Sequence, residues 1–275
     1  MRRTPASPVT DRDVLVAYDG TAESRAAAQW AADSASRRGL RLVVATVMES
    51  GGRGLGPSAG PTRHLLFSEG HRIADPEVAR IRAGHPGLDV REVVMLGRPA
   101  RTLEHLAAHA AQIVLGVEAR HAVARLVFGS VAHHLLRTTT TTAVVLVPRA
   151  GGSPDGAAVP PGRVVAVVGP RAGTRALDTA RAEAALRDVD VRLVRTLAPG
   201  GHVEVRTHDG TVQDFVEHEV TATDLVVLGN HEPGEHRHLL VDRALLAVLS
   251  HPTCPVLVVP DTDSVRTDAD VPVGA

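Results

Sequence analysis

The stretch DVLVAYDGTAESRAAAQWAADSASRRGL (residues 13–40) predicts a buried β-strand that leads directly into an α-helix. Its first part is a short apolar run, and its second part is an alanine-rich segment with a helical pattern. Thr21 is a suitable N-cap, Glu23 suits the first turn of the helix, and Gly39 suits its end. A strand followed in this way by a helix is the repeating unit of an α/β fold.

The same pattern returns later in the chain, and this internal repeat is the strongest sign of its organisation. VVAVVGPRAGTRALDTARAEAAL (residues 164–186) matches the first strand, turn and helix, and TCPVLVVPD echoes TTAVVLVPR. Continuous apolar strands that alternate with helices favour a parallel sheet covered on both faces. We therefore expect an α/β protein with two tandem, doubly wound, parallel five-stranded sheets. The expected segments are a disordered start (1–11), a first unit (12–149), a linker (150–162), a second unit (163–261) and a disordered tail (262–275).

The second unit is shorter than the first. Gly169 stands 150 residues after Asp19, whereas Gly229 stands 113 residues after Gly116, so 37 residues are missing between these points. The loss removes the second helix, because VRLVRTL is followed by only APGG before HVEVRT. A parallel crossover needs about a dozen residues, while an antiparallel hairpin needs two to five. These two segments are therefore expected to form an antiparallel hairpin, or else HVEVRT is not a sheet strand.

The composition excludes several kinds of function. The net charge of −1 gives no reason to expect nucleic acid or a membrane surface as a partner. All 30 basic residues are arginine, which excludes a lysine nucleophile, a Schiff base and the lysine of a P-loop. The single cysteine, Cys254, fits a reducing compartment. With no signal-peptide pattern and no apolar run of membrane-spanning length, a soluble cytoplasmic protein is expected.

Glycines mark a candidate binding site in the first unit. Asp19 and Gly116 follow apolar strands, and they would be neighbours if those strands pair where the strand order reverses. Gly129 and Ser130 stand at the start of a helix, whose free N–H groups suit an anion. Arg120, in the loop between, could add positive charge. The simpler interpretations are that Asp19 forms an Asx-turn and that Ser130 is only an N-cap.

The cluster NHEPGEHRH (residues 230–238) contains metal-ligand side-chain types, but its spacing matches no zinc motif. A solvated polar loop is the preferred interpretation there, and no metal site is expected.

The chain resembles a tandem member of the universal stress protein family, which has the adenine-nucleotide α-hydrolase-like fold. The resemblance covers both repeats and rests on VAYDG, FGSVAHHLL and CPVLVVP. The family's nucleotide signature has Gly, two residues, Gly, nine residues, Gly and then Ser or Thr. Gly116, Gly129 and Ser130 match it at the right spacing, and Ala119 replaces the second glycine.

The resemblance implies that the first unit binds ATP, or ADP or AMP, with Mg²⁺ possible through the phosphates. Asp19 would contact the base and ribose end. An alanine forced into a left-handed backbone at position 119 would cost roughly 1–2 kcal/mol, or about tenfold in affinity. In the second unit, Gly169, Glu232 and Asp242 take the key positions and make a poor site. The implied site residues are Ala17, Tyr18, Asp19, Gly116, Ala119, Arg120, Gly129, Ser130 and Val131.

The function implied by the resemblance is a stress-response protein that binds nucleotide weakly and is not an enzyme, although slow hydrolysis stays open. One alternative is a scaffold in which both sites have lost nucleotide binding. A less favoured alternative is an adenine-binding enzyme such as a nucleotidyltransferase, which the absent lysine and HxGH-type motif oppose. The last strands of the two units are expected to pair antiparallel, within the chain or across a dimer. Pairing within the chain is preferred, and a homodimer of the whole chain is expected in addition.

Overall fold

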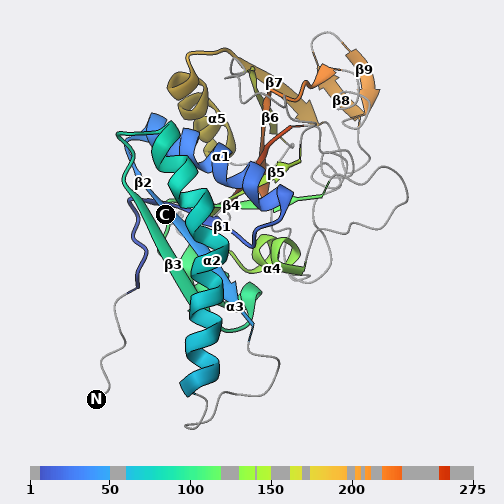
Figure 1. Ribbon diagram of the computed structural model, residues 1–275. Coiled ribbons are helices and arrows are strands. Elements are labelled where there is room, and N and C mark those ends of the chain that lie inside the picture. The colour runs from blue at the N-terminus through green and yellow to red at the C-terminus, as the bar shows by residue number, and fades with distance from the viewer. Residues whose placement is uncertain are drawn as a thin grey trace, which may run out of the picture.

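A computed structural model describes most of the first half of the chain and the main elements of the second (Figure 1). The described residues are 7–49, 60–118, 130–139, 141–149, 162–168, 174–196, 202–205, 208–211, 219–230 and 254–260. The first half contains β1 (Asp13–Ala17), α1 (Ala22–Arg38), β2 (Arg41–Met48), α2 (Gly60–Gly84), β3 (Val90–Leu96), α3 (Pro99–Ala107), β4 (Gln112–Val117), α4 (Ser130–Thr138) and β5 (Ala143–Pro148). The second contains β6 (Val164–Val168), α5 (Thr174–Arg187), β7 (Val191–Thr196), β8 (His202–Val205), β9 (His208–Thr211), β10 (Leu225–Asn230) and β11 (Val256–Pro260).

The predicted α/β class and the mostly parallel sheet are confirmed. The strands of the first half lie in the order β3-β2-β1-β4-β5, and all of these neighbours are parallel. The order β7-β6-β10-β11 in the second half repeats the order β2-β1-β4-β5. The repeat seen in the sequence is therefore also a repeat in strand order.

The two sets of strands expected from the sequence are joined edge to edge. All the described strands belong to one 11-stranded sheet, because β11 pairs antiparallel with β5 and joins the two sets. The pairing places Leu257 opposite Val145. Each of these strands would otherwise be an unpaired apolar edge, which is an aggregation hazard. The expected antiparallel contact of the last strands is thus present within the chain.

The shortened part of the second half forms antiparallel strands. β7 pairs antiparallel with β8, which confirms the hairpin expected from the missing helix. The prediction missed β9, which pairs antiparallel with β8 in a register that places Val205 opposite His208. Only two residues separate β8 from β9, too few for a crossover to a parallel neighbour. The described part of the second half therefore contributes six strands to the sheet, where five were expected.

Two apolar clusters cover the two faces of the sheet. On one face, the alanines of α1 and residues of α2 and α5 pack on strand residues such as Val14 and Val44. On the other face, α3 and α4 pack on the alternate strand residues, among them Leu15 and Ile113. Order also begins earlier than expected, since Val9, inside the segment predicted to be disordered, is buried in the second of these clusters. In the part of the chain that is described, no helix combines the length and apolar character needed to cross a bilayer.

The predicted boundaries of the first helix are confirmed. Thr21 is the N-cap of α1 and accepts a hydrogen bond from Ser24 N at 3.2 Å. Gly39 ends the helix with φ of 62°, a left-handed conformation that glycine adopts without steric cost. The α1 helix therefore begins at the C-terminal end of β1, the edge at which the candidate site was expected.

Candidate functional site

The strand order reverses between β1 and β4, which is where ligands bind in open parallel sheets. β1 and β4 are parallel neighbours, with Val16 opposite Val114. Asp19 follows the end of β1, and Gly116 lies near the end of β4. The sequence predicted that Asp19 and Gly116 would be neighbours if their strands pair, and these two strands do pair.

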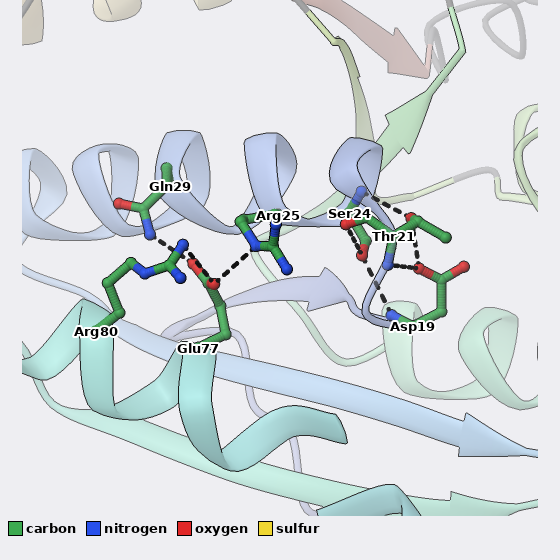
Figure 2. Close-up of polar contacts among 7 residues, drawn as sticks. All are labelled: Asp19, Thr21, Ser24, Arg25, Gln29, Glu77 and Arg80. Carbon is green, nitrogen blue, oxygen red and sulfur yellow. Dashed lines mark hydrogen bonds and ion pairs between the residues drawn. The ribbon is translucent and has the colours of Figure 1, made fainter. Parts of the chain in front are cut away.

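Asp19 forms the Asx-turn that was the simpler interpretation of this residue (Figure 2). Its Oδ1 accepts hydrogen bonds from Thr21 N at 3.0 Å and from Thr21 Oγ1 at 2.6 Å. Partial burial raises the pKa of the Asp19 carboxyl, but the hydrogen bonds from Thr21 outweigh it and the net pKa is lowered. The residue is exposed, and Figure 2 shows its other carboxylate oxygen pointing away from Thr21. Asp19 thus shapes the turn and still presents an ionised oxygen to solvent.

The turn makes a first testable prediction. Replacing Thr21 with alanine removes both the N-cap of α1 and the hydroxyl that donates to Asp19. Loss of an N-cap of this kind costs about 1 kcal/mol, so thermal unfolding should show a melting temperature lower by roughly 2–4 °C. A Thr21→Ser variant keeps the hydroxyl and should melt close to the wild type; an equal loss in both variants would contradict the capping role.

Packing explains why glycine stands at position 116, a reason that the sequence did not reveal. A Cβ atom at this position would lie 2.6 Å from Ser24 N and closer still to the carbonyl group of Glu23. The sequence had suggested that this glycine allows close approach of a ligand. In the structure, the backbone that approaches it is the first turn of α1. At Gly116 the face of the sheet toward α1 is therefore filled by that helix, which leaves the opposite face for close approach to this strand.

Several partly exposed apolar residues belong to that opposite face. Ala17 at the end of β1 and Val131 in the first turn of α4 pack against the same core cluster. Val47 and Met95, near the ends of β2 and β3, pack against it as well. The sequence reasoning missed these two residues, although strand alternation could have placed Val47 on the face of Ala17, because Ala17 is opposite Ala45 in the register.

Tyr18 is not brought together with Ala17. Its side chain is 5% exposed and belongs to the cluster formed by α1 and α2 on the other face of the sheet. Burial raises the pKa of its hydroxyl, and the charge of Glu77 adds to this increase. Neighbouring strand residues point to opposite faces, so only the backbone of Tyr18 shares the edge of the site. Its amide N is used in the fold, donating to Ala45 O at 2.9 Å.

A buried carboxylate holds α1 against α2 (Figure 2). Glu77 on α2 is 1% exposed and accepts a hydrogen bond from Gln29 Nε2 at 2.6 Å. Arg25 and Arg80 lie 3.5 Å and 3.2 Å from its Oε2. A buried charge is costly unless it is paired and hydrogen-bonded, and here it is both. This network supports the packing of α1 on α2, and it lies on the face of the sheet opposite to Ala17 and Val131.

Ser130 begins α4, as the sequence predicted, and its side chain is exposed. Ala119, Arg120 and Gly129 lie outside the described residues. The same holds for Gly169, Glu232, Asp242 and the histidine-rich segment 231–238, on which the comparison with the second unit depended. Among the described residues there is no group of three or more His, Cys, Asp or Glu side chains placed to hold a metal ion.

The sequence pattern of the universal stress protein family matches residues 12–148. The chain is 29% identical over 137 residues to one universal stress protein of Mycobacterium tuberculosis. This match covers 48% of this chain and 46% of that protein. The chain is 32% identical over 143 residues to a second one, covering 50% of this chain and 42% of the relative. The match thus spans less than half the length of these curated relatives.

Solved structures show where the fold recurs. A universal stress protein from Archaeoglobus fulgidus matches with a TM-score of 0.65 at 15% identity, covering 91% of this chain and 97% of the other. A putative universal stress protein from Pseudomonas aeruginosa matches with a TM-score of 0.53 at 14% identity, covering 92% and 94%. At such identities the likeness concerns the fold alone. Through the sequence match of residues 12–148, the chain belongs to the universal stress protein family.

Proposed function

We propose that this protein is a cytoplasmic stress-response protein whose first half, residues 12–149, binds an adenine nucleotide weakly. The observation that carries the proposal is the edge between β1 and β4, where the exposed carboxylate of Asp19 follows the strand end and partly exposed Ala17 lies beside it. We propose binding without efficient turnover, because the sequence has no P-loop lysine, no evident catalytic base and no evident magnesium-binding carboxylate pair.

The described residues suit the two ends of a nucleotide. Ala17, Val47 and Val131 offer apolar contact of the kind a base needs. Asp19 can accept hydrogen bonds from ribose hydroxyls, since its pKa is lowered and it is ionised at neutral pH. Ser130 at the start of α4 offers a hydroxyl and the positive end of the helix dipole to a phosphate. Magnesium, if present, would enter with the phosphates.

Calorimetric titration with ATP and with ADP tests the proposal. Ser130→Asp is the most informative variant, because aspartate is a favoured residue at a helix start and should leave the fold intact. Two like charges about 4 Å apart repel by ~4 kcal/mol at an effective dielectric near 20. We therefore expect ATP affinity to fall more than about tenfold, while the conservative variant Ser130→Thr binds like the wild type.

Two outcomes would redirect the proposal. Undiminished ATP binding by Ser130→Asp would show that the phosphates lie elsewhere. No heat from the wild type would favour the second candidate function, a scaffold without nucleotide. That candidate has specific support, because Asp19 is used in an Asx-turn and Gly116 is required by the packing of α1, so both residues have a role without any ligand.

A further inference from the structure

A histidine–carboxylate pair joins the two helices on the face of the proposed site. His134 Nε2 on α4 lies 2.7 Å from Glu104 Oε2 on α3, and the two side chains are 29% and 38% exposed. The hydrogen bond from His134 is the largest influence on Glu104 and lowers the pKa of its carboxyl. Glu104 is therefore ionised at neutral pH, whereas histidine ordinarily changes its charge between pH 5 and 8.

His134 lies directly behind the end of α4 that would meet the phosphates. Residues four apart lie on the same face of a helix, so Ser130, His134 and Thr138 form one stripe. At the C-terminal end of this stripe, Thr138 Oγ1 donates a hydrogen bond to His134 O at 3.0 Å, within the same helix. The pair with Glu104 therefore ties α4 to α3 one helical turn after Ser130.

A short helix depends on such contacts. α4 has only nine residues, and helices of this length are unstable in water without tertiary packing. Its buried contacts are Ala132, Leu135 and Leu136. The His134–Glu104 pair is a polar contact to α3 that adds to this apolar face. A change in the strength of this contact should therefore change how firmly Ser130 is held at the start of α4.

We propose that His134 is a positioning residue that makes nucleotide affinity at the start of α4 depend on pH, through its contact with Glu104. This inference rests on the proposed nucleotide site. Because Glu104 is already ionised, protonation of His134 turns a hydrogen bond between a neutral imidazole and a carboxylate into an ion pair, which adds a Coulomb attraction to the contact. When His134 is protonated and Glu104 is ionised, both partners are charged and α4 is held most firmly. Affinity should then be higher at pH 6 than at pH 8.

The charged groups around His134 are few among the described residues. Glu104 faces it from α3, and Arg101 acts on Glu104 from the same helix. His133 and Arg137 on α4 are exposed, and β5, which also packs against α4, carries no titratable side chain. His133 therefore provides a matched control, as an adjacent histidine on the same helix with no part in the pair.

The test measures ATP affinity at pH 6 and pH 8 for the wild type, His134→Gln and His133→Gln. Glutamine can donate a hydrogen bond but cannot take up a proton. Dividing wild-type affinity by variant affinity at each pH removes the effect of phosphate protonation. For His134→Gln the ratio should be about two- to fivefold at pH 6 and near one at pH 8. For His133→Gln it should stay near one, and a His134→Gln ratio unchanged between the two pH values would overturn the proposal.

A second measurement separates this inference from the nucleotide site itself. The backbone amide resonance of Ser130 should differ between pH 6 and pH 8, and this difference should be much smaller in Glu104→Gln. If the wild type binds no ATP at either pH, the proposed function fails, yet this amide titration still decides the positioning role. An amide that titrates equally in wild type and Glu104→Gln would refute that role.

Discussion

Gly116→Ala should lower the melting temperature by about 5–10 °C, the largest effect we expect from adding a single methyl group. The added Cβ would lie 2.6 Å from Ser24 N and closer to the Glu23 carbonyl, both backbone atoms of the first turn of α1. A side chain could rotate away, but helical backbone can move only with its whole helix. Overpacking of this kind costs about 1–3 kcal/mol, and we expect the upper end here.

Gly87→Ala is the matched control, because a Cβ at that position meets no atom within 4 Å. We expect it to melt within about 2 °C of the wild type. If Gly116→Ala proved equally stable, α1 would have to move easily, and the packing reason for this glycine would be wrong. Loss of ATP binding in Gly116→Ala would not by itself identify a ligand contact, since the variant also displaces the turn that contains Asp19.

Asp13→Ala should destabilise the protein by about 2–4 kcal/mol. Asp13 is 1% exposed at the start of β1, and its carboxylate bonds Arg41 Nε at 2.8 Å, Arg41 Nη2 at 2.7 Å and Thr10 N at 2.7 Å. Breaking a buried pair typically costs about 3–5 kcal/mol. The lower range applies because the Arg41 side chain is 29% exposed and can return to water. Asp11→Ala, two residues earlier and exposed, should change stability by less than about 0.5 kcal/mol.

The pH dependence of this contribution has a definite sign. Burial raises the pKa of the Asp13 carboxyl, but the hydrogen bonds from Arg41 and Thr10 outweigh burial and the net pKa is lowered from 3.8. A lowered pKa in the folded state means that the stabilisation is complete above the unfolded value and is lost as pH falls through the folded value. Denaturant unfolding should show that the free energies of unfolding of the wild type and of Asp13→Asn differ by a constant amount from pH 5 to 7. A difference that grew on acidification below pH 4 would contradict this assignment.

Much of the fold follows from the sequence because its signals are local. The N-cap Thr21, the terminal Gly39 and the apolar run before them specify one strand and one helix within 28 residues. The missing helix of the second half could be found by counting, because chain length alone decides whether two neighbouring strands can be parallel. The extra strand β9 was not found, since four residues with a glycine give no strand pattern of their own.

The candidate site was predictable only in outline. Alternating strand faces separate Tyr18 from Ala17, although the two are adjacent in sequence and were both expected at the site. The need for glycine at position 116 could not be predicted either, because the atoms that a side chain there would meet belong to residues 23 and 24. A glycine near a strand end has the same appearance in a sequence whether a ligand or a helix approaches it.

The sequence by itself determined the order of strands and helices in the first half, the repeat, and the lack of room for a parallel crossover in the shortened second half, since these depend on spacing and on chain length. Only the tertiary structure decided that the two sets of strands form one sheet, that α1 packs on Gly116 and that His134 meets Glu104. Each of these contacts joins segments that are distant in the chain. They depend on how whole elements pack, and no local pattern of side chains records that geometry.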